Sequence, residues 1–345
     1  MRAALLDARG ANDLVGMIHD LAMLRIELTP TVAPAADHVA WSRLGAEYSP
    51  SDTARALATG QLFERGWMLR PMADLGLFLG GMHTWAERAG AREWMEANAE
   101  FVARILDRIA ADGPQTSRDI PDEADVPWMS TGWTNNRNVT QMLECLHMTG
   151  ELAVVGHAGR LRVWDLADRV FADVPEVPAD EARRIRSERL LHACGIMRDS
   201  IAVSPGELHG VDPVGLPATI EGVQGKWRVD PAQIEKTRFE GRTALLSPFD
   251  RLMTDPQRVG RLFEFDYTLE MYKPERQRIW GQFALPILHG DRLVGKVDAK
   301  SDHLTGRFVV HAIHEDTPFD RETRAAVEAE IESFASWLRL DVTHS

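Results

Sequence analysis

The stretch from Ala91 to Phe171 constrains the fold most, because it carries several secondary-structure signals in a clear order. Residues Glu93–Ala111 have apolar side chains at helical spacing, and Gly113-Pro114 ends that helix. Thr116-x-x-Asp119 has the form of a capping box and predicts a second, brief helix. A third helix is predicted over Asn136–His147, whose apolar residues share one face.

A β-hairpin is predicted directly after the third helix. Leu152–Val155 is expected to form one strand, Gly156–Gly159 the turn, and Arg160–Leu166 the second strand. In the second strand Arg160 and Arg162 alternate with apolar residues, so both arginines are expected on the face opposite to those residues. Helices followed by a hairpin are typical of a winged helix, whose third helix enters the DNA major groove while the hairpin lies along the backbone.

The third predicted helix has a polar face that suits this placement. Arg137, Thr140 and Gln141 fall opposite the apolar stripe, and Asn135 and Asn136 stand at the start of the helix. Such side chains are suited to base edges and phosphates, so these five residues are the first candidates for DNA contact, together with Arg160 and Arg162. Two alternatives stay open, since the same face is compatible with an ordinary solvated helix and with a protein-protein module.

The regions on either side repeat this order of elements, although not its sequence. We therefore expect an α+β fold made of tandem winged-helix units, at 1–90, 91–175 and 176–240, followed by a β-rich part at 241–345. The flanking helices are expected at Asn12–Leu24, Ala35–Leu44, Ser51–Thr59, Asp180–Cys194, Pro217–Gln224 and Asp320–Leu340, a capping box at Ser204 and Glu207, and strands at Phe63–Leu69, Lys226–Val229, Arg278–Leu288, Arg292–Lys300 and Gly306–His314.

The net charge of −13 speaks against binding to nucleic acid, because lysine and arginine supply most of the affinity for phosphates. The acidic excess is concentrated in Glu315–Glu332 and Asp119–Asp125, whereas Arg251–Lys300 contains nine Lys or Arg and seven Asp or Glu. Lys296 and Lys300 share a face of a predicted strand and are candidates for phosphate contacts, with a solvated, lysine-protected strand edge as the alternative. The uneven distribution of charge keeps DNA binding possible.

Several function classes lose support from the composition. The two cysteines, Cys145 and Cys194, lie far apart and outside any Cys-x-x-Cys pattern, which argues against disulfides and a thiolate zinc site. His311 and His314 are expected on opposite faces of a strand, so they do not predict a metal site. No apolar run approaches transmembrane length. We expect a cytoplasmic monomer that uses no metal or organic cofactor and does not contact membranes.

Four stretches of the sequence, spread over nearly the whole chain, resemble a bacterial family of winged-helix DNA glycosylases that includes enzymes unhooking interstrand crosslinks. The resemblance implies three tandem winged-helix units, a β-rich C-terminal part whose hairpin approaches double-stranded DNA, and a role in DNA repair. The stretches are Trp41-Ser42-Arg43-Leu44-Gly45, Leu245-Leu246-Ser247-Pro248-Phe249-Asp250, Arg261-Leu262-Phe263-Glu264-Phe265-Asp266-Tyr267 and His289-Gly290-Asp291-Arg292-Leu293-Val294-Gly295-Lys296-Val297-Asp298.

The resemblance also indicates where catalysis would take place. The family has a Gln, one apolar residue, and then Gln or Asp, upstream of the Trp-Ser-Arg-Leu-Gly stretch; the matching positions here are Arg25, Ile26 and Glu27. Hydrolysis of an N-glycosidic bond needs a positioned water and a negative or dipolar group beside an oxocarbenium-like sugar. Glu27 is the candidate base or cation stabiliser, and Arg25 is expected to place a phosphate or to pair with Glu27. An Arg25–Glu27 ion pair without catalytic role is the alternative.

Other constellations give weaker signals. Asp37-His38 is a second candidate for proton transfer, although such a pair at a helix start is more often a cap. Trp128 and Trp133 flank the predicted recognition helix, where stacking on an extruded base competes with ordinary core packing. The sequence thus predicts a monofunctional DNA glycosylase for bulky alkylated or crosslinked bases. A non-enzymatic DNA-binding protein or regulator and a protein-interaction module are the alternatives.

Overall fold

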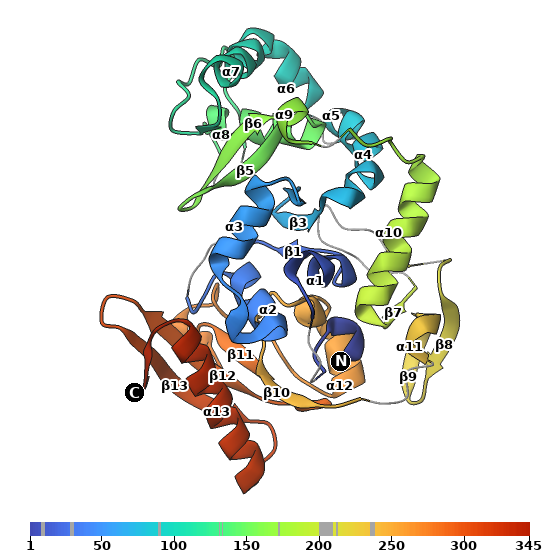
Figure 1. Cartoon of the computed structure of the whole chain (residues 1–345), viewed down its shortest axis with the longest axis vertical. Helices are drawn as coiled ribbons and strands as arrows, with labels where there is room; N and C mark the ends of the chain where they lie inside the picture. Colours follow the sequence, from blue (N-terminus) through green and yellow to red (C-terminus); the bar gives the residue numbers. More distant parts are fainter. Residues whose placement is uncertain are drawn as a thin grey trace. The chain divides into compact units, whose positions relative to one another are not determined.

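The computed structural model describes residues 1–7, 11–27, 31–88, 91–130, 132, 134–171, 173–199, 210–211, 213–234 and 239–345. The chain forms two compact units, which we call unit 1 (Met1–Pro50 with Ser187–Ser345) and unit 2 (Ser51–Arg186). Both units combine helices with β-sheets, as the sequence predicts (Figure 1). The capping box predicted at Ser204 and Glu207 lies outside the described residues.

Unit 1 joins the N-terminal elements to the C-terminal part of the chain. Its helices are α1 (Leu14–Asp20), α2 (Ala35–Leu44), α11 (Pro231–Ile234), α12 (Pro256–Phe263) and α13 (Arg321–Trp337), and the unit boundary falls inside α10 (Ala179–Cys194). Its strands are β1 (Leu24–Arg25), β7 (Ile196–Arg198), β8 (Leu216–Ile220), β9 (Val223–Val229), β10 (Arg242–Leu245), β11 (Ala284–Gly290), β12 (Arg292–Asp302), β13 (Arg307–Glu315) and β14 (Asp341–His344).

A five-stranded sheet in the order β10-β11-β12-β13-β14 forms the centre of unit 1. Its neighbouring strands are antiparallel except for β13 and β14, which are parallel. Helix α13 packs on this sheet through Val327, Ile331 and Phe334, all of which are buried (Figure 1). The ring of Phe334 also stacks on that of His38 in α2, with the ring centres 4.4 Å apart, so α2 is fixed to the same core.

Unit 2 contains the central region of the sequence. Its helices are α3 (Pro50–Ala58), α4 (Leu79–His83), α5 (Trp85–Arg88), α6 (Arg92–Ala97), α7 (Ala99–Asp112), α8 (Asn138–Thr149) and α9 (Ala167–Val170). Its strands are β2 (Leu62–Glu64), β3 (Met68–Pro71), β4 (Gln115–Thr116), β5 (Leu152–Ala158) and β6 (Leu161–Leu166). Strands β4, β5 and β6 form an antiparallel sheet in the order β4-β6-β5, and α8 contacts β5.

Several predicted elements are confirmed almost residue for residue. Helix α2 has the predicted bounds, and it ends where Gly45 adopts a φ of 75° that an L side chain rarely adopts. Helices α8 and α10 and strands β5, β6, β12 and β13 lie within a few residues of their expected positions. These are the elements with clear periodicity and a glycine or capping residue at one end.

Other elements differ from the prediction, each for a local physical reason. The expected helix Glu93–Ala111 is interrupted at Asn98, whose buried amide donates to the carbonyl oxygens of Trp94 and Val126. The expected helix at Thr116-x-x-Asp119 is a turn instead. There the Asp119 carboxylate accepts both the backbone N–H and the hydroxyl of Thr116, at 2.9 and 2.6 Å.

Four further predictions need correction outside the central region. The helix expected at Pro217–Gln224 is wrong, because Gly222 (φ 74°) turns the chain between the paired strands β8 and β9. The strand expected at Phe63–Leu69 is a hairpin of β2 and β3, with positive φ at Gly66 and Trp67. The helix expected at Asn12–Leu24 ends at Asp20, and the strand expected from Arg278 begins only at Ala284.

Two buried histidines should make the fold sensitive to acid. Burial lowers the pKa of His38 to about 4 and that of His147 to about 3. Above a pH of about 6.5, the pKa of histidine in the unfolded chain, both histidines are neutral in the folded and in the unfolded state, so they do not make the free energy of unfolding depend on pH. Below that value the unfolded chain binds a proton that the folded chain does not. The free energy of unfolding should therefore fall by about 2 kcal/mol per histidine between pH 7 and pH 5.

Urea unfolding of wild type and of His38→Gln at both pH values measures this effect. The drop in unfolding free energy from pH 7 to pH 5 should be smaller in His38→Gln by about 2 kcal/mol. His303 is exposed, so His303→Gln is the matched control and should behave as wild type does. An identical pH dependence in wild type and His38→Gln would contradict the expected low pKa of His38.

Candidate functional site

The segment Leu24–Glu27 runs beside the start of α2 in unit 1. Leu24 and Ile26 are buried, whereas Arg25 and Glu27 are only partly buried. This alternation is typical of an extended segment whose odd-numbered residues point away from the core. Arg25 and Glu27 are therefore the more exposed residues of this segment.

Arg25 lies against an aromatic side chain that sequence reasoning did not connect with it. Its guanidinium carbon is 4.9 Å from the centre of the Phe249 ring, and Phe249 in turn contacts the ring of Phe283, at 6.2 Å between ring centres. A cation above an aromatic face at this distance is attracted by the ring quadrupole. The only signal for Phe249 in the sequence is its place in the Leu-Ser-Pro-Phe-Asp stretch.

Glu27 is held through its backbone at the start of α2. Its carbonyl oxygen accepts the N–H of Ala35, the first residue of that helix, at 3.3 Å. As a whole residue, Glu27 is only partly buried.

A buried ion pair between Arg43 and Asp250 fixes the chain at the residue directly after Phe249. Both terminal nitrogens of Arg43 bond the carboxylate of Asp250, Nη2 at 3.0 Å, and both side chains are inaccessible to solvent. Arg43 also donates to the carbonyl of Ala4 at 3.1 Å and to the hydroxyl of Ser42 at 2.7 Å. Two of the stretches that carry the family resemblance are thus joined by one salt bridge, which holds Phe249 beside Arg25.

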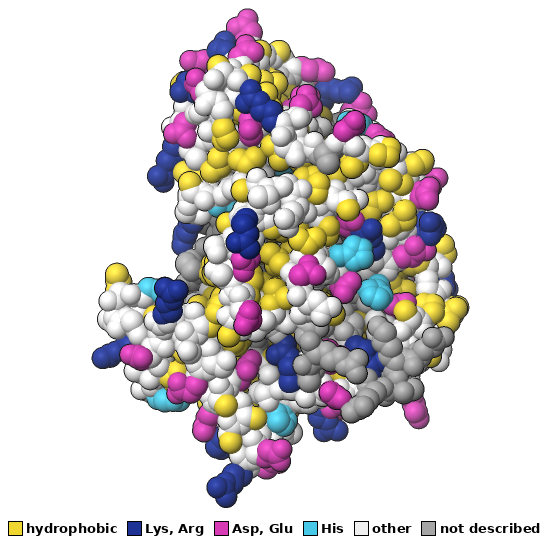
Figure 2. Space-filling model, viewed as in Figure 1, with side chains coloured by type: hydrophobic (Ala, Val, Ile, Leu, Met, Phe, Trp, Pro, Cys, Tyr) yellow, Lys and Arg dark blue, Asp and Glu magenta, His cyan; other side chains and the backbone are white. Residues whose placement is uncertain are grey.

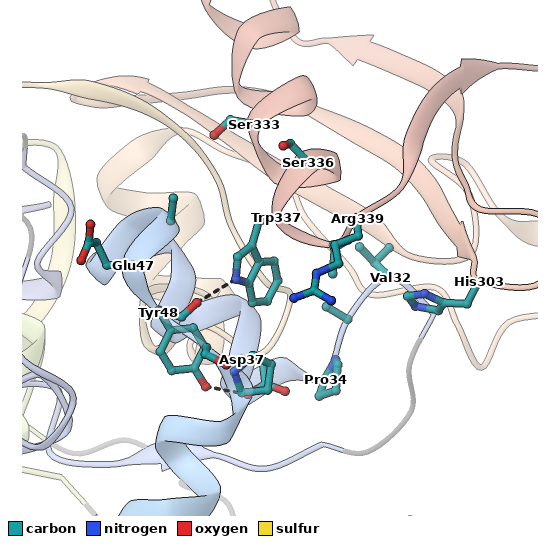
Figure 3. Close-up of a pocket in the computed structure, with 15 residues that line it drawn as sticks. Val32, Pro34, Asp37, Glu47, Tyr48, His303, Ser333, Ser336, Trp337 and Arg339 are labelled. Atoms are coloured by element: carbon teal, nitrogen blue, oxygen red, sulfur yellow. Dashed lines mark hydrogen bonds between the residues drawn. The ribbon is translucent and has the colours of Figure 1, made fainter.

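The second candidate pair is Asp37-His38, in which Asp37 lines a pocket and His38 is buried in the core. His38 is 1% exposed, and its Nε2 lies 3.0 Å from the carbonyl oxygen of Leu245, so its role is structural. Asp37 faces a pocket of about 810 Å³ in unit 1, which Tyr48, Trp337 and Arg339 also line (Figure 3). Burial raises the pKa of Asp37, and the Tyr48 hydroxyl, donating at 2.6 Å, opposes that shift. Glu27 does not line this pocket.

The polar residues at the start of α8 are mostly at the surface of unit 2. Asn135, Asn136, Arg137 and Thr140 are exposed, and Gln141 is partly buried. Asn136 has a φ of 55°, and the side-chain oxygen of Asn135 accepts the N–H of Ser130 at 3.1 Å, so the chain before the helix has a defined shape. Arg160 is exposed at the turn between β5 and β6. The exposure of these residues is compatible with contact to a ligand, and no contact is shown.

Arg162, unlike Arg160, is buried, so the predicted DNA contact at Arg162 has no support. It is 4% exposed, and its guanidinium lies between two carboxylates: Nε bonds Glu64 at 2.6 Å and Nη1 bonds Glu144 at 2.6 Å. The ring of Trp67 covers it at 3.6 Å. The alternation of charged and apolar residues fails here because Glu64, distant in the sequence, supplies a buried counter-charge.

Lys296 is likewise an interior residue. It is 1% exposed, its Nζ bonds the carboxylate of Asp316 at 2.7 and 2.9 Å, and the rings of Phe265 and Trp280 lie within 4.6 Å of it. The expected phosphate contact at Lys296 therefore has no support. Lys300, further along β12, is exposed and stays a candidate.

The remaining signals carry little weight for the site. Trp128 packs edge-on against Trp94, with ring centres 4.9 Å apart, and Trp133 lies outside the described residues. Acidic and basic side chains are interspersed on the face drawn in Figure 2. Within the described part of the chain, no group of three or more His, Cys, Asp or Glu side chains is placed to hold a metal ion. No helix among the described residues is long and apolar enough to cross a bilayer.

Comparison with known proteins shows similarity to a protein family and to a solved structure. A family model described as "DNA glycosylase AlkZ-like" matches residues 21–337, a span that includes Arg25, Glu27 and all four resembling stretches. The solved structure of Streptomyces sahachiroi DNA glycosylase AlkZ superposes with a TM-score of 0.63 at 16% sequence identity, covering 100% of this chain and 97% of that one. At this identity the structural likeness establishes a shared fold.

Proposed function

The chain belongs to the AlkZ-like DNA glycosylase family, and from that premise we propose that it is a monofunctional DNA glycosylase that acts on bulky alkylated or crosslinked bases. The observation that carries the proposal is the position of Glu27. This carboxylate occupies the third position of the family's catalytic signature, on an extended segment at the start of α2, and it is partly exposed. Release of free base from an alkylated duplex tests the proposal.

Hydrolysis of the N-glycosidic bond of an alkylated base needs few protein groups besides the carboxylate of Glu27. Alkylation of a ring nitrogen gives the base a positive charge, so the base can leave as a neutral molecule with the electron pair of the C1′–N bond. Water then attacks the oxocarbenium-like C1′, and Glu27 takes the proton of that water or stabilises the positive sugar. Neither role needs a metal or an organic cofactor.

Arg25 and Glu27 both depart from the family pattern, which has Gln at the first position and Gln or Asp at the third. A guanidinium cannot orient water as an amide does, and its charge opposes a developing cation. Its stacking on Phe249 fixes the cation locally, which suits contact with the phosphate next to the reacting nucleotide. The same departure favours one alternative, namely a winged-helix DNA-binding protein or regulator that has lost catalysis.

We further propose that part of unit 2 acts as a winged helix on DNA. The order α7, β4, α8, β5, β6 and the sheet order β4-β6-β5 support this reading, with α8 as the recognition helix and the β5–β6 turn as the wing. Asn135, Asn136 and Gln141 are suited to base edges, and Arg137, Thr140 and Arg160 to phosphates. Arg162 and Lys296 are not among the proposed contacts, whereas Lys300 is.

Arg137→Ala and Arg160→Ala should each weaken duplex binding about equally for all sequences. Each substitution should also reduce the slope of log K against log salt by about 1, because one phosphate contact is lost. Fluorescence anisotropy of a labelled duplex between 50 and 200 mM salt, a range over which about a thousandfold change is typical, measures both quantities.

Arg183→Ala is the matched control for these two variants. Arg183 is an exposed arginine of unit 2 on α10 that pairs with Asp180, away from the proposed recognition helix. Its slope should equal that of wild type. Wild-type slopes in Arg137→Ala and Arg160→Ala would show that α8 and the β5–β6 turn do not contact the phosphates.

A further inference from the structure

The loop at residues 271–281, which we call the basic loop, is positively charged in an acidic protein. It contains Lys273, Arg276 and Arg278 against Glu275, and Lys273 pairs with Glu270 directly before the loop, whereas the whole chain has a net charge of −13. It directly precedes the central strands of unit 1. A local excess of cations in an acidic chain is the pattern expected of a segment that meets a polyanion.

Two large apolar side chains of this loop point into solvent. Tyr272 is 80% exposed and Ile279 is 67% exposed, although both belong to residue types that usually contribute to a core or an interface. Arg276 is exposed on the same loop. Cations combined with exposed aromatic or aliphatic residues are typical of elements that contact phosphates and bases together.

The backbone of the basic loop is nevertheless firmly held. The carboxylate of Glu270, which is 2% exposed, accepts the N–H groups of Ile279 and Trp280 at 2.7 and 2.8 Å and the Nζ of Lys273 at 2.9 Å. Arg278 Nε donates to the carbonyl of Lys273 at 3.0 Å. A loop fixed in this way presents its exposed side chains with little loss of conformational entropy on binding.

The basic loop also leads directly to the candidate active site within unit 1. It is followed at once by Gln282 and by Phe283, which is 1% exposed and whose ring contacts that of Phe249 at 6.2 Å. Phe249 carries the guanidinium of Arg25. The contact between the Phe283 and Phe249 rings and the contact between Phe249 and Arg25 therefore connect the end of the basic loop to the segment that carries Glu27.

We propose that the basic loop is a wedge that enters the duplex beside the reacting nucleotide. Arg276 contacts the phosphate backbone, and Tyr272 and Ile279 insert against neighbouring bases, where they fill the space that an extruded nucleotide leaves. Stacking of one base on an aromatic side chain is worth about a tenfold change in affinity. The inference rests on the proposed function, because a wedge is useful only where a base must leave the stack.

The test uses the full chain and a duplex with an abasic-site analogue next to 2-aminopurine, whose fluorescence rises when it is unstacked. Wild type should raise the fluorescence. Tyr272→Ala combined with Ile279→Ala should remove most of that rise and weaken binding to this duplex about tenfold, whereas Tyr272→Phe should keep it. Leu304→Ala is the matched control, since Leu304 is 100% exposed on another loop of unit 1 and should behave as wild type.

The outcomes separate this inference from the function on which it rests. A wild-type fluorescence rise in the double variant, together with unchanged affinity, overturns the wedge and leaves the glycosylase proposal intact. If wild type binds no duplex at all, the proposed function fails and the wedge fails with it. Loss of the rise in Tyr272→Phe would also count against the wedge, because the ring that should stack is still present.

Discussion

Glu27→Ala is expected to lower the single-turnover rate of base release from an alkylated duplex about 100-fold or more, while the affinity for the duplex changes little. The expected size follows from the loss of a general base or of a charge placed beside the developing cation. Binding should persist because Glu27 is an anion and contributes nothing to phosphate contacts. The rate is measured with enzyme in excess, and the affinity by anisotropy of the same duplex.

Two further variants make this test specific. Glu27→Gln should fall between wild type and Glu27→Ala, because the amide keeps a dipole that can position water but lacks the charge. Glu47→Ala removes an exposed carboxylate of unit 1 and should release base as fast as wild type does. Equal rates for wild type, Glu27→Gln and Glu27→Ala would be fatal to the catalytic role of Glu27.

Asp250→Ala should strongly lower the free energy of unfolding of unit 1. It leaves the guanidinium of Arg43 charged, without its main partner and closed off from water, because both side chains of the pair are inaccessible. Removing one partner of such a pair costs about 3–5 kcal/mol. The free energy of unfolding of Asp250→Ala, from urea titration, should therefore be lower than that of wild type by this amount.

A control variant and a double variant show whether the loss of stability in Asp250→Ala comes from the unpaired charge of Arg43. Arg324→Ala breaks a pair with Glu315 in which Arg324 is half exposed, and it should change the free energy of unfolding little, because solvent screens the pair. Replacing both partners, as Arg43→Met with Asp250→Leu, should recover part of the loss, because no buried charge is then left alone. A loss below about 1 kcal/mol in Asp250→Ala would show that Arg43 finds water or another partner.

The sequence predicts this fold well where the signals are local. Helix α2 was predicted at its exact bounds because apolar spacing and a terminal glycine agree, and the β5–β6 hairpin was found from its turn and alternation. Where tertiary contacts decide, the prediction fails. Asn98 interrupts a helix because its amide bonds a distant loop, and strand pairing makes a hairpin where a helix was predicted at 217–224.

In the candidate site, too, the sequence fails to predict the position of a side chain where a residue distant in the sequence determines it. Arg162 and Lys296 were predicted as DNA contacts from their positions in a hairpin and a strand, and Glu64 and Asp316, which lie elsewhere in the sequence, make their burial possible. The Arg43–Asp250 pair spans 207 residues and has no local signal. Glu27 was found through the family resemblance, by counting back from Trp41, since nothing in its own neighbourhood marks it as catalytic.

The most direct measurement of the central claim is the product formed by the wild-type protein on a duplex with an alkylated guanine. The account predicts that free alkylated base appears in solution, in equal amount to abasic sites in a strand whose backbone stays intact. Tight binding of the duplex without any free base would contradict it, and the chain would then be a DNA-binding protein on a glycosylase fold.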